Sequence, residues 1–141
     1  MSDFWVIPDE GKKLALDELY RLTTTRESFL LAQFIGGGPV TDSSVFADFT
    51  LASYVGYTSV AIARGDWAAA AIAAHIGSIS KSADPVFACI SGSPQTVNGL
   101  LLYGATSGKI YAGVNYGTPI VMSAGTTDTI TPLKVQDKTF V

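Results

Sequence analysis

The chain has 141 residues, of which 48% are hydrophobic and 15% charged, and its formal net charge at pH 7 is −3. This length fits one domain, residues 1–141, with a sizeable core. The few Lys and Arg residues are scattered, so we expect no nucleic-acid partner. The charged share lies below the quarter or so that is typical of soluble domains. The shortage indicates either apolar patches used for association or a surface filled by Ser, Thr and Gly.

The N-terminal stretch has no basic segment followed by a long apolar core, and no run of about 18 apolar residues occurs. We therefore expect neither a secretion signal nor a membrane span. Cys89 is the single cysteine, so no intrachain disulfide is expected, and its apolar neighbours favour a buried thiol in a strand. These features are compatible with synthesis in a reducing cytoplasm.

A short β-prone segment, Phe4–Ile7, precedes the one convincing helix, which we predict over about residues 10–22 with Asp9 as its N-cap. The apolar residues of this helix fall on one side, which predicts that it lies on a sheet. Two interpretations of residues 1–8 stay open. They form either a docking arm that adds a strand to a partner's sheet, or the first strand of the chain's own sheet.

Ser28–Ile35 is apolar on both alternating faces apart from Gln33, which is typical of a strand covered on both sides. The cover is either the helix and core or a neighbouring subunit. We predict further strands at Gly56–Ala63 and Asp84–Ser91. Residues 67–79 are ambiguous, because their alanines favour a helix whereas their isoleucines alternate with a period of two; we favour a strand.

Two apolar runs, Leu100–Tyr103 and Ile110–Val114, flank the turn-forming linker Gly104–Lys109 and predict a β-hairpin. Pro119–Met122 and Thr127–Val135 are again short and β-prone, which predicts an antiparallel meander that closes the domain. Eight or nine short strands separated by turns are typical of a sandwich or barrel.

Two motifs favour structural explanations. Gly104–Lys109 superficially resembles a phosphate-binding loop, but three residues instead of four separate its glycines, and Ile110 follows the lysine in place of Ser or Thr. Arg64–Asp66 spells the Arg-Gly-Asp tripeptide that adhesion receptors recognise, yet a turn between strands explains the same residues. Adhesion therefore becomes worth testing only if this loop is exposed.

Candidate catalytic and metal-binding residues are sparse. His75 is the single histidine, so with one cysteine the common structural zinc sites cannot be assembled. A Ser–His–Asp arrangement around His75 is formally possible, but the sequence has no Gly-x-Ser-x-Gly elbow. We assign no catalytic, cofactor or metal residue and expect that the chain is not an enzyme.

Aromatic side chains supply the candidate contact residues. Tyrosines near turn asparagines can bind sugars or anchor protein contacts, although alternating tyrosines are also ordinary in β-sheets. Trp67 is interpreted as a core or interface anchor. The tentative interface residues are Phe4, Trp5, Ile7, Tyr103, Tyr111 and Tyr116, with Asn98 and Asn115 beside the last three.

Taken in order, Pro8–Leu22, Phe29–Ile35, Tyr54–Trp67 and the glycine-rich hairpin that ends in Asp128–Pro132 resemble small virion proteins of tailed bacteriophages. Members of that group are compact β-sandwich proteins of the jelly-roll kind that decorate or cement capsids, or belong to neck and tail fibre assemblies. The resemblance implies an all-β, jelly-roll-like antiparallel sandwich with one short N-terminal helix. It implies protein contacts and no catalysis, and it carries over no site residues.

The leading hypothesis is a capsid decoration (cement) protein that is made in the host cytoplasm and located on the virion. Its expected partners are the major capsid protein or other virion proteins and further copies of itself, a trimer being favoured, with no membrane partner. The alternative is a neck- or tail-fibre-associated protein that binds a receptor or glycan. A third hypothesis, an enzyme, would require activity that depends on His75.

Overall fold

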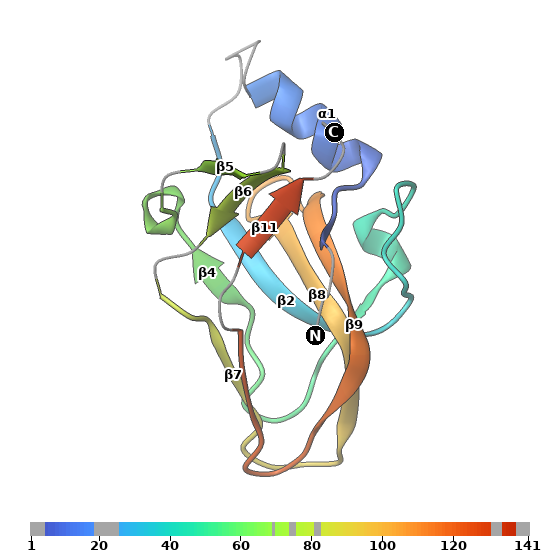
Figure 1. Ribbon diagram of the computed structural model, residues 1–141. Coiled ribbons are helices and arrows are strands. Elements are labelled where there is room, and N and C mark those ends of the chain that lie inside the picture. Colours follow the sequence, from blue (N-terminus) through green and yellow to red (C-terminus); the bar gives the residue numbers. More distant parts are fainter. Residues whose placement is uncertain are drawn as a thin grey trace.

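The computed structural model describes residues 5–18, 26–68, 70–73, 76–80, 83–130 and 134–137. These residues are mostly strands in antiparallel sheets with one short helix, consistent with the predicted all-β sandwich (Figure 1). The described elements are, in chain order, β1 (Trp5–Val6), α1 (Asp9–Leu16), β2 (Phe29–Gly36), the 3-10 helix η2 (Phe46–Asp48), β3 (Thr50–Leu51), β4 (Val60–Ile62), the 3-10 helix η3 (Arg64–Asp66), β5 (Ala71–Ala73), β6 (Ile76–Ser80), β7 (Val86–Ala88), β8 (Gln95–Gly104), β9 (Ile110–Met122), β10 (Thr127–Thr129) and β11 (Lys134–Asp137).

The largest sheet is built around the hairpin that the sequence predicts. Its strand order is β1-β9-β8-β2-β3, and β4 also pairs with β2. β8 and β9 pair antiparallel on either side of the turn after Gly104, so the predicted hairpin is confirmed. At the sheet edge, Trp5 and Val6 pair with Val114 and Gly113 of β9. The described part of the N-terminal segment is therefore the first strand of the chain's own sheet.

A second layer lies over this sheet. β10 pairs with β7, and β11 pairs with β6, both antiparallel. β7 follows β6 in the chain and β11 follows β10, so the two pairings join the same two segments of the chain. β5 adds a third strand beside β6, and Figure 1 shows β5, β6 and β11 in front of the β2–β8–β9 sheet.

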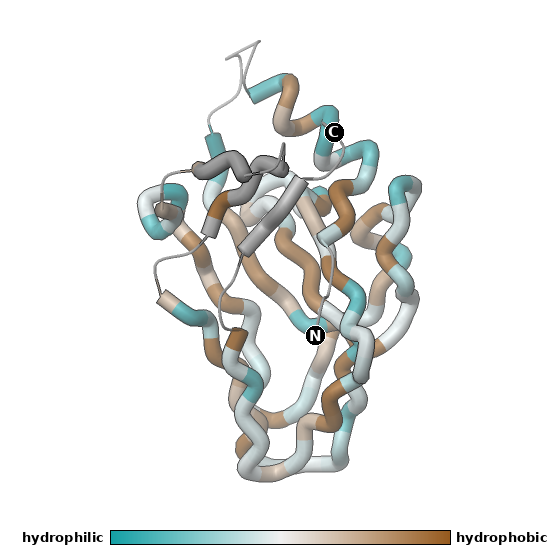
Figure 2. Tube along the Cα trace, in the orientation of Figure 1, coloured by the Kyte–Doolittle hydropathy of each residue, from teal (hydrophilic) through white to brown (hydrophobic). Residues whose placement is uncertain are grey.

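The strand β2 is buried on both faces, as the sequence predicts. Phe29 and Leu31 belong to the main core between the layers. On the opposite face, Phe34 is fully buried in a second cluster, and Figure 2 shows hydrophobic residues along β2 and β8. The residues packed in or against this second cluster include Val40, Phe46 and Phe49 from the segment that follows β2. The cover over this face thus comes from the chain's own loop, which answers the question that the sequence left open.

A buried polar bridge joins the two layers. Gln33 of β2 is 0% exposed, and its Nε2 donates a hydrogen bond to Oδ2 of Asp128 on β10 at 2.8 Å. The Tyr54 hydroxyl donates a hydrogen bond to Oε1 of Gln33, and the Tyr116 hydroxyl on β9 donates one to Oδ2 of Asp128 at 3.1 Å. Burial raises the pKa of Tyr54 to about 12, with smaller contributions from nearby groups. Tyr54 therefore remains a hydrogen-bond donor at neutral pH.

The helix begins one position earlier than predicted, and its cap is different. Pro8 is the N-cap residue, and its carbonyl accepts the first helical bond from Lys12 at 3.0 Å. Asp9 is therefore not the cap but the first helical residue, where its carboxylate contacts the Lys12 amine at 3.3 Å. The α-helix ends at Leu16, and residues 19–22 of the predicted helix lie outside the described residues.

The predicted closing meander is wrong. Pro119–Met122 is the end of the continuous strand β9, and β10 pairs with β7 and not with β9. The reason is a turn centred on Gly125, whose φ is 86° and whose N–H donates to the Cys89 carbonyl at 2.9 Å. These bonds direct the chain across to the second layer.

The remaining strand predictions are confirmed within the described residues. Gly56–Ala63 contains β4, Asp84–Ser91 contains β7, and residues 67–79 contain β5 and most of β6. Cys89 is 2% exposed and follows β7 directly, so the thiol is buried as predicted. Among the described helices, none is both long and apolar enough to span a membrane.

Substitution of Asp128 by Ala should lower the free energy of unfolding by about 2–4 kcal/mol, because the Gln33 amide and the Tyr116 hydroxyl lose their acceptor inside the protein. Urea unfolding followed by circular dichroism measures this change. Thr129→Ala is the matched control, since Thr129 lies on the same strand with its side chain exposed. Equal stability of the two variants would contradict the role assigned to the bridge.

Candidate functional site

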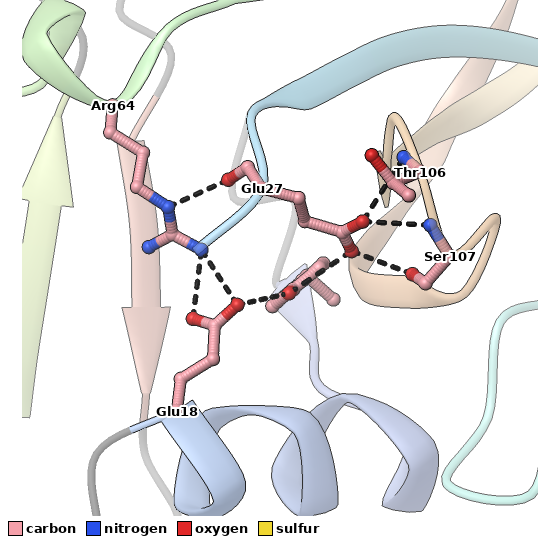
Figure 3. Close-up of polar contacts among 6 residues, drawn as sticks. Glu18, Glu27, Arg64, Thr106 and Ser107 are labelled. Carbon is pink, nitrogen blue, oxygen red and sulfur yellow. Dashed lines mark hydrogen bonds and ion pairs between the residues drawn. The ribbon is translucent and has the colours of Figure 1, made fainter. Parts of the chain in front are cut away.

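Polar side chains from five separate segments meet beside the end of α1. Glu18 follows the helix, Glu27 precedes β2, Arg64 lies in η3, Tyr111 lies on β9, and the turn between β8 and β9 contributes backbone donors (Figure 3). This group, Glu18, Glu27, Arg64, Thr106, Ser107 and Tyr111, is called the Glu27 cluster below. It is the richest concentration of charged contacts among the described residues.

The carboxylate of Glu27 lies inside the turn that superficially resembles a phosphate loop. Its Oε2 accepts hydrogen bonds from the backbone N–H groups of Thr106 at 3.0 Å and Ser107 at 2.7 Å. Its Oε1 accepts from the Ser107 hydroxyl at 2.6 Å and from Tyr111 at 3.2 Å. Successive backbone N–H groups in a turn form an anion-binding concavity. In this protein the anion is the chain's own carboxylate.

Two glycines shape this turn. A Cβ at Gly104 would lie 1.7 Å from Oε1 of Glu27, so only glycine leaves room for the carboxylate. Gly108 has a φ of 69°, a left-handed conformation that glycine adopts without strain. The glycines that suggested a nucleotide loop thus serve a tight hairpin turn around an internal anion.

The second carboxylate of the cluster pairs with arginine. Nη2 of Arg64 lies 2.7 and 2.9 Å from the two oxygens of Glu18, and Nε donates to the Glu27 carbonyl at 2.6 Å. The guanidinium also lies 4.7 Å from the centre of the Phe29 ring, a cation–π distance. Tyr111 donates to Glu18 at 2.7 Å, so its hydroxyl lies between the two carboxylates.

The surroundings within the cluster change the pKa of two of its residues, Glu27 and Tyr111. Burial raises the pKa of Glu27, but the hydrogen bonds from Ser107, Thr106 and Tyr111 outweigh it and hold the pKa below its usual value. The pKa of Tyr111 is raised, first by burial and then by the hydrogen bond and negative charge of Glu18. At neutral pH, Glu27 is therefore an anion and Tyr111 a neutral donor.

Two hollows flank the cluster. One, of about 490 Å³, lies between α1 and the β8–β9 turn, and the other, of about 400 Å³, lies under the helix. Arg26 and Tyr111 line both. The second hollow is largely apolar, with the rings of Phe29 and Trp67 in its wall. Arg26 is exposed, and among the described residues it has no hydrogen bond or ion pair.

The structure does not bring the predicted interface tyrosines together. Tyr111 lies in the Glu27 cluster, and Tyr116 is bound to the buried Asp128. Tyr103 lies elsewhere, with its ring centre 4.7 Å from that of Phe46 and its hydroxyl 3.3 Å from Ser59. The three tyrosines therefore lie in different surroundings, and their assignment as interface residues stays a prediction.

The structure describes two of the three candidate interface residues near the N-terminus. Trp5 is half-buried and packs against the main core, and Ile7 is half-buried and lines the hollow under α1. Phe4 lies outside the described residues, as does His75, so the hypothesis of His75-dependent catalysis stays a prediction. Trp67 contacts the Phe29 ring edge-on at 6.1 Å between centres, in keeping with its interpretation as a core anchor.

The Arg-Gly-Asp tripeptide forms η3, the turn that the sequence favours as its explanation. Gly65 is exposed, but Arg64 is committed to Glu18 and Glu27, and Oδ2 of Asp66 accepts the Ala63 N–H at 2.9 Å. The charged side chains of the tripeptide thus hold parts of the fold together.

The hydrogen-bonding capacity of the cluster is largely used internally. Three hydrogen bonds from Thr106 and Ser107 hold Glu27, and Arg64 holds Glu18. The single proton of the Tyr111 hydroxyl lies between the two carboxylates, closer to Glu18. Within the described ranges, no group of three or more His, Cys, Asp or Glu residues is placed to hold a metal ion. The arrangement can fix the positions of five segments relative to one another.

Sequence reasoning missed Glu18, Glu27 and Arg26. Glu18 falls within the helix predicted over residues 10–22, and Glu27 and Arg26 belong to a polar stretch before β2 with no recognised motif. The available signal was the Gly104–Lys109 turn, whose small residues and glycines indicate a place for an anion. Which anion occupies it depends on a tertiary contact across 79 or 80 residues.

Comparison with known proteins gives no match for this chain to a family model, a curated protein or a solved structure. The resemblance to phage virion proteins therefore stays a proposal.

Glu27→Gln should make the free energy of unfolding fall less steeply as the pH is lowered. Because the pKa of Glu27 is lowered in the folded state, its stabilisation is complete above the unfolded value near 4.5 and is lost as the pH falls through the folded value. We expect Glu27→Gln to cost about 1–2 kcal/mol at pH 7 and to flatten the loss below pH 5. Urea unfolding at several pH values measures both effects. The control is Asp42→Asn, because the Asp42 carboxylate is 73% exposed. This variant should lose stability below pH 5 as the parent protein does.

Proposed function

We propose that this chain is a structural protein of a bacteriophage particle that decorates the capsid and stabilises the head through protein–protein contacts. Its partners would be the major capsid protein or other virion proteins, with further copies of the chain in a homo-oligomer, for which we favour a trimer. The protein would be made in the host cytoplasm and reside on the virion. The resemblance of sequence pattern and the surface described next support this proposal.

The observation that carries the proposal is an uncharged aliphatic face on the second layer. Phe87 and Asp128 point inward, so their neighbours on β7 and β10 point outward. Val86 is 50% exposed and Ile90 is 70% exposed. Val55, 52% exposed, lies beside Ile90, whose N–H donates to its carbonyl at 2.9 Å. Exposed aliphatic groups that gather on one face favour contact with another protein.

The face is called the β7 face below and consists of Val55, Val86, Ala88, Ile90, Thr127 and Thr129. None of these side chains carries a charge, so docking would bury aliphatic groups without stripping water from an ion. A contact of this kind suits a cement protein, which must hold neighbouring capsid subunits by buried apolar area.

Within the sandwich class we propose a jelly-roll-like winding, as the resemblance implies. Strands that are distant in the sequence lie side by side in this fold, namely β1 with β9, β2 with β8 and β7 with β10. Such long-range antiparallel pairing supports this winding. The β8–β9 hairpin adds a local pair within the same sheet.

Ile90→Glu should abolish incorporation of the protein into particles, because a carboxylate would be buried in the contact without a partner. Purified particles analysed by mass spectrometry give the copy number relative to the major capsid protein, and their heat resistance gives the stabilising role. Val45→Glu is the matched control, since Val45 is 42% exposed on the loop after β2, which covers the opposite face of the main sheet. Normal incorporation of Ile90→Glu, or unchanged heat resistance of particles lacking the protein, would refute the proposal.

The alternative function is a glycan- or receptor-binding module in the neck or tail fibres. One observation favours it: Asn98, Asn115 and Tyr116 line a single hollow of about 270 Å³, together with Pro39 and Pro119. Carboxamides in a hollow can form hydrogen bonds with a saccharide. Both carboxamides are partly used already, because Asn98 donates to the Ile35 carbonyl at 3.0 Å and Asn115 binds both backbone groups of Val40.

The two functions predict different outcomes for attachment to the host cell. A glycan site in this hollow should lose attachment when Pro119→Trp fills it, because the exposed edge position tolerates a larger side chain. A decoration protein should leave attachment unchanged. An adsorption assay with phage carrying this variant, compared with phage carrying Lys109→Gln in the distant hairpin turn, decides between them.

A further inference from the structure

The two hollows beside α1 share a wall and differ in character. Arg26 and Tyr111 line both of them. The hollow under the helix is lined mainly by apolar side chains and backbone, including Phe29, Trp67 and Leu102. Its volume of about 400 Å³ lies within the range of small-molecule sites, which is roughly 300–1,000 Å³. An apolar chamber therefore opens beside a cation.

The hydrogen bonds that the polar groups around the chamber already make determine which of these groups could bind a ligand. The Glu27 carboxylate accepts three hydrogen bonds from Thr106 and Ser107, and the single proton of the Tyr111 hydroxyl is shared between the Glu18 and Glu27 carboxylates. Arg64 is held by Glu18 and the Glu27 carbonyl. Among the charged groups that line the chamber, Arg26 is the one that makes no hydrogen bond or ion pair within the described part of the chain, whereas Nε and Nη2 of Arg64 are already used.

The acidic residues that line the neighbouring hollow with Arg26 are bound by other groups. Asp17 lies 3.3 Å from the Lys13 amine, and Glu18 lies 2.7 Å from Arg64. The Glu27 carboxylate is held in the turn by backbone and hydroxyl donors. A ligand carboxylate at Arg26 would thus meet a cation that the neighbouring acids do not neutralise by contact.

Trp67, whose side chain lines the chamber, has a buried Nε1–H group with no hydrogen-bond partner among the described residues. An unpaired buried donor is costly, and native proteins usually satisfy it. Because this N–H is inaccessible, Trp67 contributes apolar ring surface to the chamber wall.

We infer that the chamber under α1 binds a small amphiphile with an apolar body and one carboxylate head, the body lying against Phe29, Trp67 and Leu102 and the head on Arg26. This inference concerns a ligand site and stands apart from the proposed role on the virion. It commits to an anionic head because the uncommitted polar group at the chamber is a guanidinium.

Octanoate is the probe for this site, and 1-octanol and octylamine are the same chain with an uncharged and a cationic head. The Trp5→Phe variant of the full chain leaves Trp67 as the single tryptophan, so its fluorescence reports on the chamber, and calorimetry gives the affinities. We expect octanoate to bind at least about tenfold more tightly than 1-octanol, and octylamine to bind most weakly.

Two variants test the two halves of the site. Arg26→Gln should lower the affinity for octanoate at least about tenfold and leave 1-octanol almost unchanged. Ala15→Phe should block both ligands, because Ala15 is exposed on α1 at the rim of the chamber and a ring there would fill it without disturbing the core. Lys109→Gln removes a positive charge away from the chamber and should change neither affinity.

Thermal unfolding of each variant shows whether it is folded. The inference is overturned if octanoate produces neither heat nor a change in Trp67 fluorescence, if Arg26→Gln binds octanoate as the parent does, or if folded Ala15→Phe still binds it. Preference for octylamine over octanoate would equally refute the anionic head.

Discussion

The fold depends on one buried hydrogen-bond bridge, between Gln33 of the main sheet and Asp128 of the second layer. Gln33 is fully buried, and Asp128 is 8% exposed. Burying either side chain without a hydrogen-bond partner would cost free energy. Together with Tyr54 and Tyr116, the two side chains form hydrogen bonds with one another. Hydrophobic contacts hold the layers together without direction, whereas this bridge has a fixed geometry. It therefore sets the position of β10, and through the β7–β10 pairing it sets the outward face of the second layer.

The double burial of β2 follows from the same arrangement. Residues of β2 alternate between the interior that contains Gln33 and the opposite side that contains Phe34. The loop after β2 folds back over that second side, and the side chain of Asn115 binds both the N–H and the carbonyl of Val40 to hold it there. An apolar strand covered on both sides is thus explained within one chain. Support for association rests on the β7 face, where exposed aliphatic side chains have no such cover among the described residues.

The sequence predicts the features that local patterns control. An apolar run on both faces identified β2, a period of two favoured strands within residues 67–79, and the small residues after Leu100–Tyr103 identified the β8–β9 hairpin. Features that depend on distant partners were missed. Thr127–Thr129 has the composition of a strand whichever neighbour it pairs with, so the sequence does not choose between β9 and β7. The helix cap depends on Pro8 supplying its carbonyl to Lys12, a bond that preference for an Asp cap does not reveal. Glu18, Glu27 and Arg64 meet only in three dimensions.

The Glu27 cluster shows why a motif must be interpreted together with its occupant. A turn that directs backbone N–H groups inward attracts an anion, and sequence alone does not distinguish a bound phosphate from an internal carboxylate. In this chain, Glu27 fills the turn, and its own carbonyl binds Arg64, which in turn holds Glu18 beyond the end of α1. The turn therefore ties the hairpin to the helix and to η3 through charged groups. Arg26, the residue before Glu27, is left outside these contacts, so the same stretch that closes the anion site presents an uncommitted guanidinium to the chamber beside it.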